Sequence, residues 1–218
     1  MDELVERLLK LDTCAVSDSL DRLGRTGVVL GLPPMSPPAK IAGRVVTVKL
    51  SDRNAENSTT ARHLGTSAIM AASAGDVIVI EHGRPDAAGW GGILSAAAKT
   101  KGVAGVIVDG AARDIDEARE LEFPVFARQA TPMTARGRIV EESFNEPVRI
   151  GRIQVNPGDL VLADGSGVVF LDAEKAEEAI AGAEQIAARE AKMKAAVLAG
   201  DPVTEVMGRD YETMLSRT

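Results

Sequence analysis

The feature that most constrains the fold is an alternation of apolar and helical segments across residues 76–127. Three short apolar segments have the length and bounding turns of buried strands, and two segments with helical spacing separate them. The predicted strands lie at 77–81, 103–108 and 124–127, and the predicted helices at 91–101 and 115–121. Asp109-Gly110 is expected to end the second strand. Strands that alternate with helices in this way predict an α/β unit with parallel strands.

The flanking segments predict one domain with helical ends. Tight polar turns, NPGD and DGSG, separate short strands near the end of the domain and favour antiparallel hairpins. A proline-rich run, GLPPMSPP, predicts a rigid extended connector. Thr13 or Ser17 is expected to cap the second helix. The remaining predicted strands are 42–50, 149–155, 160–163 and 168–171, and the remaining helices are 2–11, 13–24, 61–73, 173–200 and 203–215.

Composition excludes several classes of protein. The chain has a formal net charge of −7, 3% aromatic residues and no basic block, so we predict no nucleic-acid partner. No apolar run approaches the roughly 20 residues of a membrane span, and the first residues lack a secretory signal, so no membrane partner is expected. The single cysteine, Cys14, allows no intrachain disulfide, which fits the cytoplasm. Cys14 is expected to be a small buried residue.

Motifs of several enzyme classes are absent. The sequence has no glycine fingerprint for dinucleotides, no P-loop and no Gly-x-Ser-x-Gly elbow. The only histidines are His63 and His82, and neither stands in a zinc motif.

A glycine-rich segment, Gly89–Leu94, opens a predicted helix. Glycines let the backbone approach a ligand closely, and the first N–H groups of a helix have no internal partners. A small carboxylate is the natural ligand for such a helix start. The alternative is an ordinary loop around a structural Trp90.

Arg113 and Asp114 follow the apolar strand VIVDGAARD, and ligands of open α/β sheets lie beyond the carboxyl ends of strands. The guanidinium of Arg113 matches the carboxylate of a 2-oxo acid, and Asp114 offers an oxygen ligand for Mg²⁺. The alternative is that Asp114 caps the next helix and forms a surface ion pair with Arg113.

The run GGILSAAAKTKGVAGVIVDGAARD at 91–114, followed by FPVFAR at 123–128, resembles the RraA-like family. This family includes 4-hydroxy-4-methyl-2-oxoglutarate/4-carboxy-4-hydroxy-2-oxoadipate aldolases and regulators of ribonuclease E activity. The resemblance covers roughly residues 13–172 and is also visible in VSDSLDRLG and PGDLVLAD.

The resemblance implies a swivelling β/β/α fold at 1–172, with central β-structure flanked by helices. It further implies a homotrimer or hexamer with sites between subunits. The polar majority of the carboxy-terminal helix separately indicates that residues 173–218 form a helical extension that packs on a neighbouring subunit. Arg113 is expected to bind the pyruvyl part of the substrate, and Asp114 to hold a divalent cation, Mg²⁺ or Mn²⁺, mostly through water. The backbone of Gly91, Gly92, Ile93 and Leu94 is expected to cradle the substrate.

One residue departs from the family. Characterised aldolases often have an acid at the second position of the cradle, where this chain has Gly92. That acid is thought to hold the water that moves protons, a function typically worth about 10²–10⁴-fold in rate. Glu81, His82 and Asp86 are close to the cradle in sequence.

These features predict a metal-dependent lyase that cleaves a 4-hydroxy-2-oxo dicarboxylate to pyruvate through a stabilised enolate, with oxaloacetate decarboxylation as a side activity. The main alternative is a non-catalytic, protein-binding regulator of the ribonuclease E inhibitor type. Weaker alternatives are a Schiff-base aldolase that uses Lys99 or Lys101, and a phosphohistidine in the turn Thr59–His63. Glu190, on the long carboxy-terminal helix, is a further candidate to support a neighbouring subunit's metal.

Overall fold

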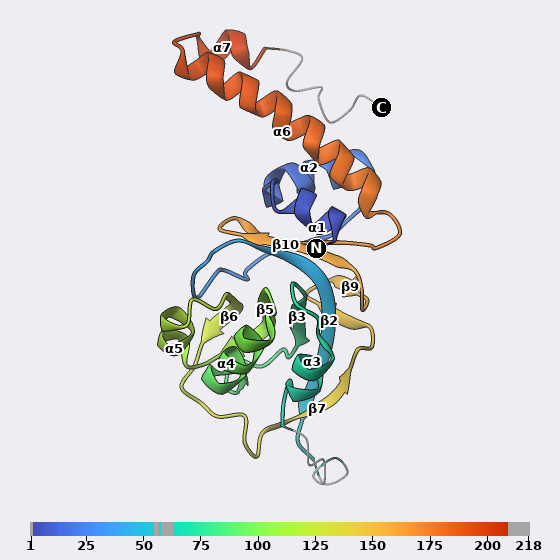
Figure 1. The fold of residues 1–218 in the computed structure, drawn as a ribbon, viewed down its shortest axis with the longest axis vertical. Coiled ribbons are helices and arrows are strands. Elements are labelled where there is room, and N and C mark those ends of the chain that lie inside the picture. Colours follow the sequence, from blue (N-terminus) through green and yellow to red (C-terminus); the bar gives the residue numbers. More distant parts are fainter. Residues whose placement is uncertain (1, 55–56, 58–62, 209–218) are drawn as a thin grey trace.

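The computed structural model describes residues 2–54, 57 and 63–208. The strands are β1 Val28–Val29, β2 Ile41–Asp52, β3 Val77–Glu81, β4 Ala88–Trp90, β5 Gly105–Ala112, β6 Val125–Ala130, β7 Ile139–Phe144, β8 Val148–Ile150, β9 Ile153–Val155, β10 Leu160–Asp164 and β11 Gly167–Leu171. The helices are α1 Glu3–Leu8, α2 Thr13–Arg22, α3 Thr66–Ala71, α4 Gly92–Lys101, α5 Ile115–Glu120, α6 Ala176–Leu198 and α7 Val203–Val206. Together they form the predicted mixed α/β fold, a central sheet flanked by helices (Figure 1).

The predicted parallel unit is confirmed. Strand β3 pairs in parallel with β2 and β5, and β5 pairs in parallel with β4 and β6. Val77–Ile80 are fully buried, as expected for a parallel strand covered on both faces. Helices α3, α4 and α5 lie on one face of this unit (Figure 1), and their apolar side chains share a core with it.

Strand β2 joins the two halves of the fold. Its first residues pair with β10 in antiparallel fashion, its middle pairs with β3, and its end pairs with β7. The predicted antiparallel hairpins are present as β8–β9 and β10–β11. A second core fills the space between these β elements, with Val79, Ile107 and Val161 among its fully buried members.

A third core lies on the outer side of β10 and β11, where α1, α2 and α6 pack. Ala176, Ile180 and Ile186 of α6 are buried there, so the first half of this helix belongs to the body of the protein. The second half of α6 and α7 project away from the body (Figure 1). Among the described residues, no helix is both long and apolar enough to cross a membrane.

Four predicted segments have other bounds in the structure. Strand β5 does not end at Asp109-Gly110 but continues to Ala112. Helix α3 begins only at Thr66, and residues 61–62 of the predicted helix lie outside the described residues. The segment predicted as one strand at 149–155 turns at Gly151 and forms parts of β8 and β9. Helix α7, Val203–Val206, corresponds to the first residues of the helix predicted at 203–215. Residues 209–215 lie outside the described part of the chain.

Two side-chain predictions near α2 were also wrong. Asp12, not Thr13 or Ser17, caps α2 by accepting a hydrogen bond from the N–H of Ala15 at 2.8 Å. Thr13 instead donates its N–H and its hydroxyl to Asp164. Cys14 is exposed rather than buried.

Candidate active site

The glycine-rich turn between β4 and α4 is held by Trp90. The Trp90 ring is 2% exposed and stacks on Phe123, with 6.3 Å between the ring centroids. Its Nε1–H donates to Ser95 Oγ at 2.9 Å, which ties the turn to the second turn of α4. Trp90 therefore has the structural role that we set out as the alternative for this segment, but it fixes a turn that remains open to ligands.

The amino end of α4 has unused hydrogen-bond donors. Gly91 occupies the N-cap position and supplies no side-chain cap. The N–H of Gly92 donates to Asp114 Oδ2 at 3.0 Å, whereas the N–H groups of Ile93 and Leu94 donate to no described residue. Because these two groups lie at the positive end of the helix dipole, they favour an anionic ligand.

Arg113 and Asp114 lie directly at the end of β5, beside this turn. The N–H of Arg113 donates to the carbonyl of Trp90 at 3.0 Å. Asp114 occupies the N-cap position of α5 with left-handed backbone angles, φ 57° and ψ 40°, but its side chain makes no cap hydrogen bond. Its Oδ2 accepts instead from Gly92 N–H and from Arg113 Nε at 3.2 Å. Of the alternative that we set out for this pair, the ion pair with Arg113 is present and the side-chain cap by Asp114 is absent.

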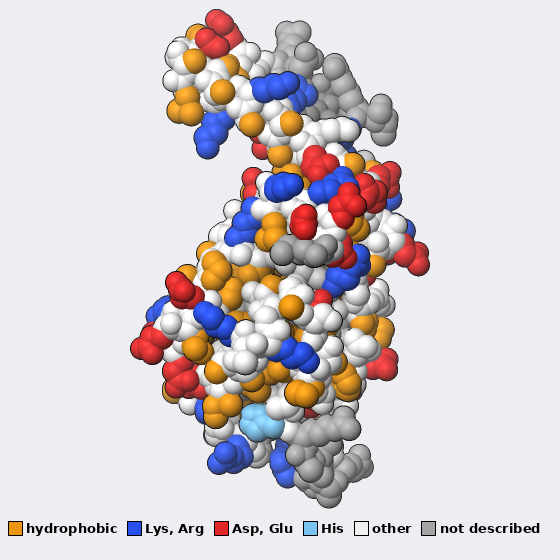
Figure 2. Space-filling model, in the orientation of Figure 1, with side chains coloured by type: hydrophobic (Ala, Val, Ile, Leu, Met, Phe, Trp, Pro, Cys, Tyr) orange, Lys and Arg blue, Asp and Glu red, His pale blue; other side chains and the backbone are white. Residues whose placement is uncertain are grey.

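A cavity of about 290 Å³ joins these groups. Its volume is at the lower end of the range for small-molecule sites. Arg53, Arg113 and Arg136 line it with Asp114, so its described lining residues carry a formal charge of +2, against −7 for the whole chain. Figure 2 shows basic side chains beside a histidine at the end of the molecule opposite α6. The other lining residues are His63, Leu64, Ala88–Leu94, Thr134, Ala135, Gly137, Ile139 and Val140.

The three titratable residues before the turn have other partners. Glu81 accepts a hydrogen bond from the N–H of Arg149 at 2.6 Å. The carboxylate of Asp86 accepts hydrogen bonds from Arg84 Nε at 2.8 Å and from Arg84 Nη2 at 2.7 Å. His82 is buried, and its Nε2 lies 2.6 Å from the carbonyl oxygen of Ala87. Burial lowers the pKa of His82 below its ordinary value, which keeps the ring neutral. None of the three lines the cavity.

The lysines of the Schiff-base alternative lie at the carboxyl end of α4. Lys99 Nζ donates to the carbonyl of Leu121, and Lys101 Nζ donates to that of Met70. At 1.5 Å per residue, these positions are roughly 10–14 Å along the helix from Gly92. Of the proposed phosphohistidine turn, residues 59–62 lie outside the described part of the chain, and His63 lines the cavity.

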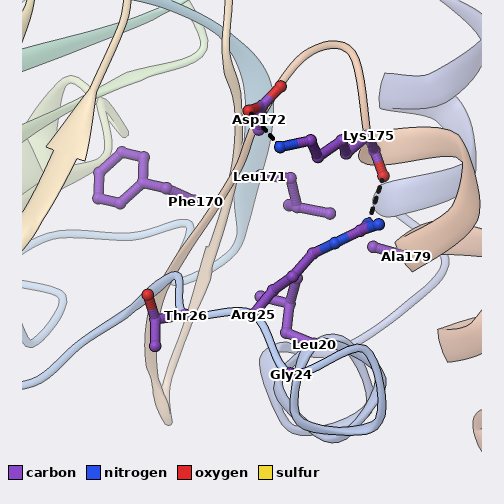
Figure 3. A pocket seen from close by; sticks show the side chains of 9 residues that line it. All are labelled: Leu20, Gly24, Arg25, Thr26, Phe170, Leu171, Asp172, Lys175 and Ala179. Atoms are coloured by element: carbon purple, nitrogen blue, oxygen red, sulfur yellow. Dashed lines mark hydrogen bonds and ion pairs between the residues drawn. The ribbon is translucent and has the colours of Figure 1, made fainter.

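A second cavity of about 270 Å³ lies between α2, β11 and α6 (Figure 3). Its basic side chains are already paired. Arg25 donates to Glu178 at 2.5 Å and to the carbonyl of Lys175 at 3.4 Å, and Lys175 Nζ lies 3.7 Å from Asp172. This cavity is therefore a weaker site for an anion than the first one.

Asp114 is the carboxylate that lines the first cavity, and its Oδ1 accepts no hydrogen bond from the described residues. No cluster of three or more His, Cys, Asp or Glu side chains occurs within the described residues. Mg²⁺ usually takes one or two protein carboxylates and keeps several waters, whereas structural zinc needs four protein ligands. The donor set therefore fits a largely hydrated hard cation on Asp114.

Reasoning from the sequence missed Arg53, His63 and Arg136 as cavity residues. They come from the end of β2 and from two loops that are distant in sequence from Gly91 and Arg113. No local motif marks them, because only the tertiary fold brings those segments together.

Comparisons with known proteins agree with this architecture. The chain is 29% identical over 212 residues to DlpA of Legionella pneumophila, covering 97% of this chain but only about a third (34%) of DlpA. It is 33% identical over 134 residues to a 4-hydroxy-4-methyl-2-oxoglutarate aldolase of Thermus thermophilus, covering 61% of this chain and 76% of that protein. RraAS2 of Streptomyces coelicolor, an unusual member of the RNase ES inhibitor RraA protein family, superposes with a TM-score of 0.78 at 26% identity, over 89% of this chain and 96% of that one. The family model for Aldolase/RraA matches residues 13–170. The chain therefore belongs to the RraA-like family.

Proposed function

We propose that this protein is a divalent-metal-dependent lyase that cleaves a 4-hydroxy-2-oxo dicarboxylate to pyruvate. One observation carries the proposal: Arg113, the Asp114 carboxylate and the unused N–H groups of Ile93 and Leu94 all meet at one cationic cavity. The aldolase named among the relatives supports the same reaction.

The chain's own groups account for substrate binding. The Arg113 guanidinium binds the carboxylate of the 2-oxo acid as a planar fork, and the N–H groups of Ile93 and Leu94 orient the same end. The negative charge that develops on the pyruvyl oxygen during C3–C4 cleavage lies beside these donors. A divalent cation held by Asp114, Mg²⁺ or Mn²⁺, would supply a Lewis acid that withdraws electrons from the 2-oxo group.

Oxaloacetate decarboxylation is proposed as a side activity. It passes through the same pyruvate enolate but needs no base to take a hydroxyl proton. The donors that line the cavity, together with the metal that Asp114 would hold, support this reaction without a further base.

The test is a screen of 4-hydroxy-2-oxo dicarboxylates and oxaloacetate with Mg²⁺ or Mn²⁺, read out as pyruvate. We expect pyruvate release that EDTA abolishes and that added metal restores. A protein that releases no pyruvate from any of these substrates would contradict the proposal.

A non-catalytic, protein-binding regulator remains the second candidate, supported by the likeness to RraAS2. A pull-down with ribonuclease E, beside the pyruvate assay, separates the two functions. A regulator binds the ribonuclease and releases no pyruvate.

We also propose that the part of the predicted extension 173–218 that follows the buried first half of α6 packs on a neighbouring subunit of a trimer or hexamer. The outer half of α6 supports this, because Val197 and Leu198 are exposed on a helix that projects from the body. Within one chain, burial is the main cause that raises the pKa of Glu190. The negative charges of Asp18 and Asp12 raise this pKa further. Sedimentation of the full chain against one ending at residue 190 tests the assembly.

A further inference from the structure

The imidazole ring of His82 lies against an irregular position of β4. Between Ala88 and Trp90 the pairing of β4 with β5 shifts by one residue, which makes Gly89 the extra residue. A Cβ atom on Gly89 would lie 3.1 Å from His82 Cδ2, so the absence of a side chain there gives the ring its space. Irregular positions of this kind redirect a strand and are common beside active sites.

The same edge of the ring lies against an irregular position of β5. Between Val108 and Ala111 the pairing of β5 with β6 also shifts by one residue. Gly110 lies within this stretch, and a Cβ atom on it would be 2.4 Å from His82 Cδ2. The ring therefore packs against both strands that lead to the cavity, since β4 runs into the glycine-rich turn and β5 into the arginine–aspartate pair.

The two ring nitrogens of His82 have different surroundings. Nε2 lies 2.6 Å from the carbonyl oxygen of Ala87, and because a carbonyl only accepts, Nε2 carries the hydrogen. Nδ1 is buried and has no hydrogen-bond partner among the described residues. The ring is therefore the neutral tautomer with one N–H group, and that group holds the residue directly before β4.

The charged groups around the ring are paired with one another. Burial is the largest influence on the pKa of His82 and lowers it, and the hydrogen bond to Ala87 opposes this effect. The positive charge of Arg84 lowers the pKa further, whereas the negative charges of Asp52 and Asp86 raise it. Arg84 donates to both carboxylates. Protonation would place a second N–H group at Nδ1, where no described acceptor lies, and would therefore be costly.

We propose that His82 is a positioning residue of the lyase site, whose ring and Nε2–H bond set the ends of β4 and β5 so that the cradle and Arg113 converge on one ligand. His82 does not line the cavity, so it acts through these two strands and not on the substrate itself. The inference rests on the proposed function and adds a residue that determines the geometry of its site.

The test compares H82F and H82Q with T13V in the full chain with Mg²⁺. H82F keeps a ring but leaves the buried carbonyl of Ala87 without its donor, whereas H82Q keeps an amide N–H group and cannot be protonated. T13V removes a buried hydrogen bond between α2 and β10, outside the cavity lining, and is the control for lost stability. The probe is oxalate, a planar dianion that resembles the pyruvate enolate, and calorimetry measures its affinity.

We expect H82F to lower the affinity for oxalate and the kcat/KM for cleavage by about 10–10²-fold, as misplaced binding groups do. H82Q should recover most of this loss, and T13V should bind oxalate like the wild type. Below pH 6.5, the ordinary value for histidine, the wild type should lose affinity as His82 is protonated. H82Q should lack this loss over the range in which oxalate remains a dianion.

Three results would overturn the positioning role of His82. They are wild-type oxalate affinity in H82F, an equal loss in H82F and T13V, and failure of H82Q to restore the affinity that H82F loses. A wild-type protein that binds oxalate but releases no pyruvate would refute the proposed lyase, while the oxalate comparison would still decide the role of His82. A wild-type protein that binds no oxalate would overturn both.

Discussion

Replacing Asp114 by Asn and by Ala separates its charge from its backbone conformation. At φ 57° and ψ 40°, Asp114 is in the left-handed region, which Asn tolerates and which costs Ala roughly 1–2 kcal/mol. Ala also loses the hydrogen bond to Gly92 N–H, worth about 0.5–1.5 kcal/mol. We therefore expect Asp114→Ala to lower the free energy of unfolding by about 2–3 kcal/mol, and Asp114→Asn by less than about 1 kcal/mol.

Turnover should respond differently from stability. Both variants lose the carboxylate, so both should lose pyruvate release, although only the Ala variant is strongly destabilised. Urea denaturation and the pyruvate assay measure the two effects, with Asp116→Ala as an exposed control on the same helix. Equal stability of the Ala and Asn variants would refute the argument from backbone conformation. Wild-type turnover in Asp114→Asn would refute the role of the charge.

Three further changes probe the scaffold. Thr13→Val removes the 2.7 Å hydroxyl bond to buried Asp164 and should cost about 1–3 kcal/mol in chemical denaturation. The pKa of His82 is lower in the folded state than when unfolded, so the unfolded chain binds more protons below the ordinary His value of 6.5. Stability should therefore fall as the pH drops below that value, and His82→Gln should flatten this dependence; an unchanged dependence would count against it. Gly43→Ala would place a Cβ 2.3 Å from a backbone carbonyl oxygen and should cost about 1–3 kcal/mol in thermal unfolding, whereas Gly165→Ala, with open space around it, should be tolerated.

The parallel unit could be predicted because its strands are buried on both faces. Burial on both faces requires continuous apolar runs such as Val77–Ile80, and such runs are visible in sequence. Arg113 and Asp114 were predicted to follow the carboxyl end of a strand, and the structure places them there, beside the unpredicted strand β4 and the glycine turn. The structure brings these predicted residues to one cavity.

The end of β5 could not be predicted locally. Asp109-Gly110 has the composition of a turn, yet the strand continues because Ala111 and Ala112 pair with β4 and β6. Gly110 lies within this strand, against the buried ring of His82. A Cβ at Gly110 would lie 2.4 Å from that ring, so the glycine provides space within a strand rather than a turn. This is a tertiary contact between neighbouring strands, and no pattern within 103–112 reveals it.

The position of Glu117 beside Gly92 could not be predicted from the sequence either. The spacing of α5 marks it as an exposed helical residue, and only the packing of α5 on α4 brings its carboxylate to Gly92. From the sequence, Gly92 was compatible with weak aldolase activity, with another group in the place of the acid, or with another reaction. In the structure a Cβ atom on Gly92 would lie 1.7 Å from Glu117 Oε2, so another acid stands against this position.

The most direct test of the account is pyruvate release from 4-hydroxy-4-methyl-2-oxoglutarate by the Mg²⁺-loaded wild-type protein and by Arg113→Ala. Lys175→Ala, in the second cavity, serves as the control. We predict release by the wild type and the control, and none by Arg113→Ala at an unchanged melting temperature. Equal release by Arg113→Ala and the wild type would contradict the central claim.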